Sequence, residues 1–170
     1  PYLIQHSENP DIGKRIVYTA DNKKIGQLYA ETFAINKEKL NAGLFAAHPI
    51  GRQVGEKVYI TSPVCTLQED AIKFYARVMP GSSFQFMQAL EPLKVGHQTN
   101  EAIYKQLQSP KLILGFNCIL RYLQFKEQGL TKQMYQSLNQ VAPVFGFTTL
   151  GEQIDLMQVN QTLTLLAIED

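Results

Sequence analysis

The fold class is decided by one stretch of sequence, LILGFNCILR at residues 112–121. Its first five residues are continuously apolar, which predicts a strand buried on both faces. The residues from Arg121 to Gln128 are typical of a helix that ends at Gly129. A further helix is expected to begin at Thr131 and to stop before Pro143. A strand signal followed by helix signals favours an α+β or mixed-sheet α/β domain.

The segments on either side add strands and helices in mixed order. The turn at residues 79–82 has Pro80 and Gly81 at its centre, so the strands beside it are predicted to form a hairpin. The segment from His48 to Gly51 is expected to lie in a loop. We predict an α+β fold, a mixed β-sheet packed with several α-helices. Strands are expected at 15–19, 58–61, 74–78, 84–87, 144–147 and 162–168, and further helices at 25–33, at 37–41 and from Thr99 or Asn100 to Pro110.

Composition excludes several classes of protein. The chain has 170 residues, of which 45% are hydrophobic and 18% charged, and its net charge is +1. This apolar content fills a core and excludes disorder, while the balanced charge argues against a nucleic-acid or anionic-membrane binder. No apolar run has the length of a membrane span. Cys65 and Cys118 are too few and too far apart for a disulfide framework, so a reducing cytoplasm is the expected location.

No catalytic template is present. The sequence has no HExxH motif, no GxSxG motif, and no GxGxxG after a predicted strand. Residues 146–151 have the glycine spacing of a phosphate-binding loop, but Glu152 stands where such a loop has its lysine and would repel phosphate. His6, His48 and His97 are widely spaced. We therefore expect no enzymatic activity, no cofactor and no metal site.

The first candidate site is the end of the stretch quoted above. A cysteine at a helix N-terminus, as predicted for Cys118, can have a lowered thiol pKa. An arginine such as Arg121 can bind a carboxylate through two parallel hydrogen bonds. The alternatives are a core thiol and a surface arginine. The tendency of free cysteine to be buried favours the core thiol for Cys118, whereas both interpretations of Arg121 stay open.

Further candidates lie where predicted strands begin or end. Hydroxyl groups and backbone amides between two glycines can bind a small polar ligand, and side-chain amides can fix its orientation. The candidate side chains also have structural alternatives: they can belong to an ordinary strand-to-loop transition, hold down a neighbouring loop, or lie in a turn. The side chains are Thr148, Thr149, Glu152, Asn160, Gln161 and His48.

The order of four segments resembles that of FIST domains. The most specific part is Gly-Phe-x-Thr-x-Gly-Glu followed by Asn-Gln-Thr, and the similarity to the C-terminal FIST half runs from about Leu40 to Ile168. The resemblance implies that residues 36–170 form a FIST C-type sensory domain and that residues 1–35 end the preceding N-terminal half. The four segments are His48-Pro49-Ile50-Gly51, Phe116–Arg121, Gly146–Gln153 and Asn160–Thr164.

The resemblance implies an intracellular sensor of small ligands, with an amino acid or a similar zwitterion or anion as the ligand. Its partners would be the N-terminal FIST half and a signalling output domain. In such a site Arg121 and backbone amides near Thr148 would hold the carboxylate, Glu152 would hold the ammonium group, and Asn160 and Gln161 would orient the ligand.

Two other functions are weighed beside the sensor. Relatives joined to F-box segments imply an interaction scaffold without a small-molecule ligand. A scaffold predicts an exposed apolar patch in place of an enclosed pocket. A redox or acyl-transfer role of Cys118 would require an accessible thiolate.

Overall fold

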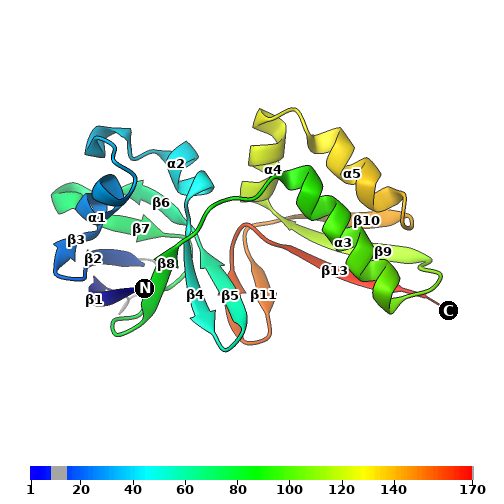
Figure 1. The fold of residues 1–170 in the computed structure, drawn as a ribbon, viewed down its shortest axis with the longest axis horizontal. Coiled ribbons are helices and arrows are strands. Elements are labelled where there is room, and N and C mark those ends of the chain that lie inside the picture. The colour runs from blue at the N-terminus through cyan, green and yellow to red at the C-terminus, as the bar shows by residue number, and fades with distance from the viewer. Residues whose placement is uncertain (9–14, 170) are drawn as a thin grey trace. The chain divides into compact units, whose positions relative to one another are not determined.

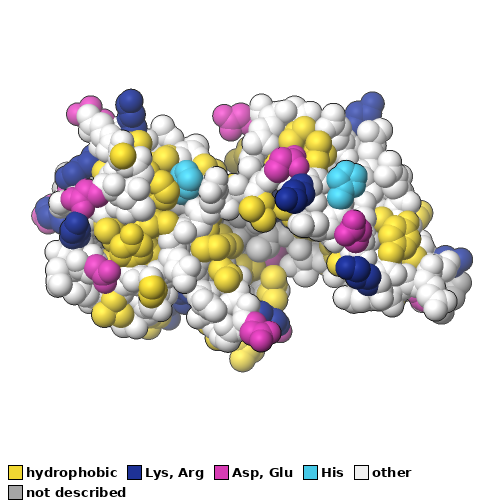
Figure 2. All heavy atoms as spheres, in the orientation of Figure 1, with side chains coloured by type: hydrophobic (Ala, Val, Ile, Leu, Met, Phe, Trp, Pro, Cys, Tyr) yellow, Lys and Arg dark blue, Asp and Glu magenta, His cyan; other side chains and the backbone are white. Residues whose placement is uncertain are grey.

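The structure, a computed structural model, describes residues 1–8 and 15–169. It divides into two compact units, which we describe separately. The first consists of Pro1–Ala89 with Met157–Asn160, and the second of Leu90–Leu156 with Gln161–Asp170. Among the described residues, no helix combines the length and the apolar character needed to cross a bilayer. Figure 2 shows acidic and basic side chains interspersed on the visible face, as expected for a nearly neutral chain.

The first unit is built on an antiparallel sheet with the strand order β5-β4-β8-β1-β2-β7-β6, with β3 beside β2 (Figure 1). Two short helices, α1 and α2, accompany it, and the turn between β2 and β3 has positive φ at Asp21 and Asn22. The elements are β1 (Tyr2–Glu8), β2 (Ile16–Ala20), β3 (Lys23–Lys24), α1 (Ile25–Thr32), η1 (Lys37–Lys39), α2 (Ala42–Ala47), β4 (Ile50–Val54), β5 (Lys57–Thr61), β6 (Pro63–Thr66), η2 (Gln68–Asp70), β7 (Ile72–Phe74), β8 (Ser83–Phe86) and β12 (Met157–Val159).

Aromatic side chains hold the core of the first unit together. The Tyr29 ring is fully buried and lies 5.4 Å from the ring of Phe45 and 4.5 Å from that of Phe86. Its hydroxyl donates a hydrogen bond to the backbone oxygen of His48 over 3.1 Å. The side chain thus links α1 to the end of α2 and to the sheet.

The second unit packs three helices on one face of a three-stranded sheet (Figure 1). Strand β9 (Leu112–Cys118) is central, parallel to β10 (Val144–Thr149) and antiparallel to β13 (Leu163–Ile168). Helix α4 (Ile119–Glu127) follows β9 without a loop, and α5 (Thr131–Asn139) packs beside it and against α3 (Pro92–Gln106). Strand β11 spans Glu152–Ile154.

The α+β class is confirmed, and so are the paired helix signals after residue 118. Gly129 has φ +70°, which is the left-handed conformation expected where a helix ends. The expected burial of β9 on both faces is wrong. Ile113 and Gly115 are buried on the helix side, but Leu114 and Phe116 on the other side are only half-buried. On the same face of the sheet as Leu114 and Phe116, the side chains of Phe145, Phe147 and Leu166 from the neighbouring strands are exposed.

The expected hairpin around residues 79–82 is also wrong. The turn forms, with Gly81 at φ +79° and the Ser82 amide donating to the Met79 oxygen. However, β7 pairs with β2 and β6, while β8 pairs with β1 and β4. The strand expected at 74–78 also differs from the structure, because β7 ends at Phe74. Ala76 and Val78 are nevertheless buried, so alternate residues continue to be buried beyond the end of the strand.

Two further expectations differ from the structure. Helix α3 begins at Pro92 because the Glu91 carboxylate accepts hydrogen bonds from the amides of Leu93 and Lys94 at 2.9 and 2.6 Å. Thr99 and Asn100 therefore lie inside the helix and do not cap it. The expected loop around His48 shrinks to two residues, since α2 precedes it and β4 begins at Ile50.

Candidate functional site

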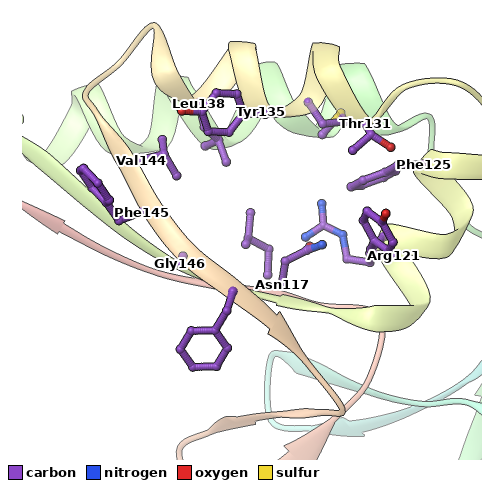
Figure 3. Close-up of a pocket in the computed structure, with 14 residues that line it drawn as sticks. Asn117, Arg121, Phe125, Thr131, Tyr135, Leu138, Val144, Phe145 and Gly146 are labelled. Carbon is purple, nitrogen blue, oxygen red and sulfur yellow. The ribbon is translucent and has the colours of Figure 1, made fainter.

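A pocket of about 250 Å³ lies in the second unit, between the helix face of the sheet and helices α4 and α5 (Figure 3). Figure 3 shows the Arg121 side chain pointing into it beside Asn117. The pocket is lined by Gly115, Asn117, Arg121, Tyr122, Phe125, Thr131, Met134, Tyr135, Leu138, Val144, Phe145, Gly146, Phe147 and Leu163.

The floor of the pocket is bare backbone because two glycines are paired there. Gly146 of β10 stands opposite Gly115 of β9 in the parallel register. Gly146 has φ +158°, and a Cβ atom built on it would lie 1.8 Å from the Gly115 carbonyl oxygen, so the position admits no side chain in this conformation. At Gly115 a Cβ atom would make only ordinary contacts, with the Leu165 side chain at 3.5 Å and with the Leu163 side chain and the Phe145 oxygen at 3.9 Å. The absence of a side chain at Gly115 leaves room above the helix face of the sheet.

Arg121 is the charged residue of this pocket. It lies in the first turn of α4, where the helix dipole disfavours a cation, and its guanidinium carbon stands 5.2 Å from the centre of the Phe125 ring. Burial lowers the pKa of Arg121, with Cys118 and Glu152 acting in the opposite direction. Among the described residues, no carboxylate lies within salt-bridge distance of the guanidinium. The group is therefore partly desolvated and lacks a close counter-ion.

The other polar lining groups are neutral. Asn117 offers an amide, and Tyr122, Thr131 and Tyr135 carry hydroxyl groups. The remaining side chains that face the helices are aromatic or aliphatic, whereas those of Phe145 and Phe147 point by register to the other face of the sheet. Such a lining, with one cation and a few neutral hydrogen-bonding groups, suits a small anion with apolar parts.

Glu152 lines a second hollow, of about 230 Å³, together with Phe116, Thr149 and Thr164. It is buried, and its carboxylate accepts a hydrogen bond from Thr149 and another from Thr162, the latter at 2.5 Å. Phe116 and Thr164 alternate with the residues that face the helices, so this hollow lies on the other face of the sheet from Arg121. The structure separates the two charges that were expected to share one ligand.

Cys118 ends β9 and precedes α4, with its side chain buried. Burial raises the pKa of its thiol, and the nearby Glu152 acts in the same direction, although backbone amides of Leu120 and Gln161 oppose the shift. A helix N-terminus alone would have lowered the thiol pKa. The environment favours the neutral thiol of a core residue.

This arrangement predicts selective alkylation. At pH 8 iodoacetamide is expected to modify Cys65, which is exposed, while Cys118 stays unmodified in the folded protein because it is buried and its thiol pKa is raised. Mass spectrometry of native and urea-unfolded samples measures both sites, with the unfolded sample as the control. Equal modification of the two thiols in the native protein would restore the case for a reactive Cys118.

The remaining predicted site residues do not line the Arg121 pocket. Thr148 is exposed. Asn160 is fully buried in the first unit, where its amide donates to the Ile60 oxygen and its side chain accepts from the Ser62 amide, as a loop tie would. His48 also lies in the first unit, stacked on Phe33 at 4.2 Å. Gln161 has φ +55°, and its backbone interacts with the Cys118 thiol.

Within residues 1–8 and 15–169, no three His, Cys, Asp or Glu side chains are grouped closely enough to hold a metal ion. The FIST C domain family matches residues 26–155, well over half of the sequence. The chain belongs to the FIST C domain family. Neither a curated protein nor a solved structure matches it. The predicted domain boundary between residues 35 and 36 stays a prediction.

In this FIST C domain, sequence reasoning missed most of the pocket lining. Asn117 lies inside the stretch at residues 112–121 but was not predicted as a site residue. Phe125 was expected on a helix without a face assigned to it. Met134 and Leu138 were expected on the apolar stripe of the helix that begins at Thr131, and both line the pocket. The signal that was available is the glycine in each of two apolar strands, Gly115 and Gly146, because glycine weakens a strand unless something must approach its backbone.

Proposed function

We propose that this FIST C domain is the ligand-binding part of a sensory signalling protein, and that it binds a small molecule carrying a carboxylate. The observation that carries the proposal is Arg121, a partly desolvated guanidinium that points into a pocket and lacks a close counter-ion. A bound carboxylate would form charge-assisted hydrogen bonds with this group. Amino acids and similar small anions or zwitterions belong to this ligand class.

Binding would be coupled to signalling through α4. Arg121 is the third residue of that helix, and the helix follows β9 directly. A ligand that binds one position of α4 better than another shifts the balance between the two positions. The recipients proposed for this shift are an N-terminal FIST half and an output domain, in a cytoplasmic protein, with the domain itself acting as a binding module and not as an enzyme.

Replacement of Arg121 tests the proposal. In isothermal titration with a panel of amino acids and other carboxylates, Arg121→Ala is expected to weaken binding about tenfold or more, because hydrogen bonds to charged groups contribute about 1.5–3 kcal/mol. Lys126→Ala is the matched control, since Lys126 is an exposed cation on the same helix. The proposal fails when no carboxylate binds, or when both variants bind as the unaltered protein does.

An interaction scaffold is the second candidate, favoured by the face of the sheet that the helices leave open. Phe145, Phe147 and Leu166 share this face by register and are 63%, 65% and 54% exposed. Apolar side chains gathered on one face are typical of protein contacts. Leu166→Asp separates the functions: loss of signalling with unchanged ligand affinity supports the scaffold, and unchanged signalling counts against it.

A further inference from the structure

We infer that the Arg121 pocket takes an organic carboxylate with a hydrophobic tail and no ammonium group, in preference to an amino acid. This inference rests on the proposed function, because it names the ligand of the same pocket. Three features carry it: the charges of the lining, the position of Glu152, and the chemistry of the walls.

The lining provides a counter-ion for a carboxylate but none for an ammonium group. Its one charged residue is Arg121, and no Asp or Glu is among the described residues that form the pocket. An ammonium group buried there would lose its water and gain only neutral acceptors, such as the Asn117 amide oxygen. It would also lie close to the guanidinium, which repels it. In a zwitterion, therefore, the carboxylate would contribute favourably to the free energy of binding and the ammonium group unfavourably.

Glu152 does not supply the missing counter-ion. Its carboxylate is engaged by the hydroxyls of Thr149 and Thr162, and it lines the hollow on the other face of the sheet. Its effect on the pKa of Arg121 is smaller than the effects of burial and of Cys118. An ammonium group bound in the pocket would therefore lie on the other face of the sheet from this carboxylate.

The walls of the pocket select for an apolar tail. Phe125, Met134, Leu138 and Val144 line it together with two tyrosine rings. Each methylene buried against such walls strengthens binding about fourfold. A cavity of about 150 Å³ accommodates benzene, so the 250 Å³ found here has room for a phenyl ring joined to a short acid. Small hydrophilic acids would leave most of the walls uncovered.

The test is isothermal titration of the chain with three matched acids. 3-Phenylpropanoate and L-phenylalanine differ only in the α-ammonium group, and propanoate lacks the ring. We expect 3-phenylpropanoate to bind at least about tenfold more tightly than either of the other two. Arg121→Ala is expected to remove this binding, with Lys126→Ala again as the control. The neutral analogue 3-phenylpropanamide should bind at least about tenfold more weakly than the acid.

The possible outcomes distinguish the two claims. If L-phenylalanine binds as tightly as 3-phenylpropanoate or more tightly, and does so through Arg121, the inference is overturned while the proposed function stands. Equal affinity for propanoate and 3-phenylpropanoate also overturns the inference alone. If no acid of the series binds, or if the neutral amide binds as well as the acid, the inference and the carboxylate-binding function both fall.

Discussion

Gly146→Ala is expected to destabilise the second unit by about 3 kcal/mol or more, because the new Cβ atom would meet backbone and not a movable side chain. The atom would stand 1.8 Å from the carbonyl oxygen of Gly115 and 2.7 Å from its carbonyl carbon. Relief requires Gly146 to leave its φ of +158° or β9 and β10 to separate, and either change weakens the parallel pairing of β10 with the central strand β9. Urea unfolding followed by circular dichroism measures the loss.

Gly115→Ala is the matched control for this substitution. It adds the same methyl group to the facing residue, but the methyl would meet Leu165 at 3.5 Å, an ordinary contact. Stability is expected to stay within about 1 kcal/mol of the unaltered protein. Because Gly115 also lines the pocket, the added methyl group should reduce ligand affinity in a folded protein. Equal stability of the two variants would contradict the clash expected between a Cβ atom at position 146 and the Gly115 backbone.

Tyr29→Ala is expected to cost about 3–5 kcal/mol, the range for deletion of a large buried aromatic ring. The Tyr29 ring contacts those of Phe33, Phe45 and Phe86, so its removal leaves a cavity among aromatic neighbours in the core of the first unit. Domains commonly have a free energy of unfolding of about 5–15 kcal/mol. The variant should therefore unfold at a much lower urea concentration, as measured by tyrosine fluorescence and hydrogen exchange.

Tyr29→Phe isolates the hydroxyl group. It keeps the ring and removes the hydrogen bond to the His48 oxygen, so the expected loss near pH 7 is about 1 kcal/mol. Burial also raises the pKa of the Tyr29 hydroxyl in the folded state. Above the unfolded value of about 10 the unfolded chain loses this proton first, so stability falls as the pH rises. The Phe variant should lack this part of the alkaline loss, and identical pH profiles would contradict the raised pKa.

Much of the second unit could be predicted because its signals are local. The apolar run of β9, the left-handed Gly129 and the stripe that begins at Met134 each depend on a few neighbouring residues. The hairpin prediction was wrong because the partner of a strand is chosen by the whole sheet. Strands β1 and β2 lie between β8 and β7, and nothing in the turn at residues 79–82 reports that.

The site was partly predictable for the same reason. Arg121 stands out in sequence because a cation follows so apolar a stretch, and the structure places it in a pocket. The pairing of Arg121 with Glu152 on one ligand stays a prediction without support from the placement of the two residues. Which face of a strand a residue points to depends on register, and the register of β9 and β10 joins segments about thirty residues apart in the chain.

The sheet of the second unit also bears on how the protein behaves in concentrated solution. Its outer strands, Val144–Thr149 and Leu163–Ile168, contain no charged residue and no proline, which are the usual protections of a sheet edge. Within the described residues, each pairs on one side only in this sheet. Edges of this kind can template intermolecular strand pairing. Preparations of the chain alone are therefore best kept dilute, and a lysine at an exposed position such as Leu166 is a rational way to raise its solubility.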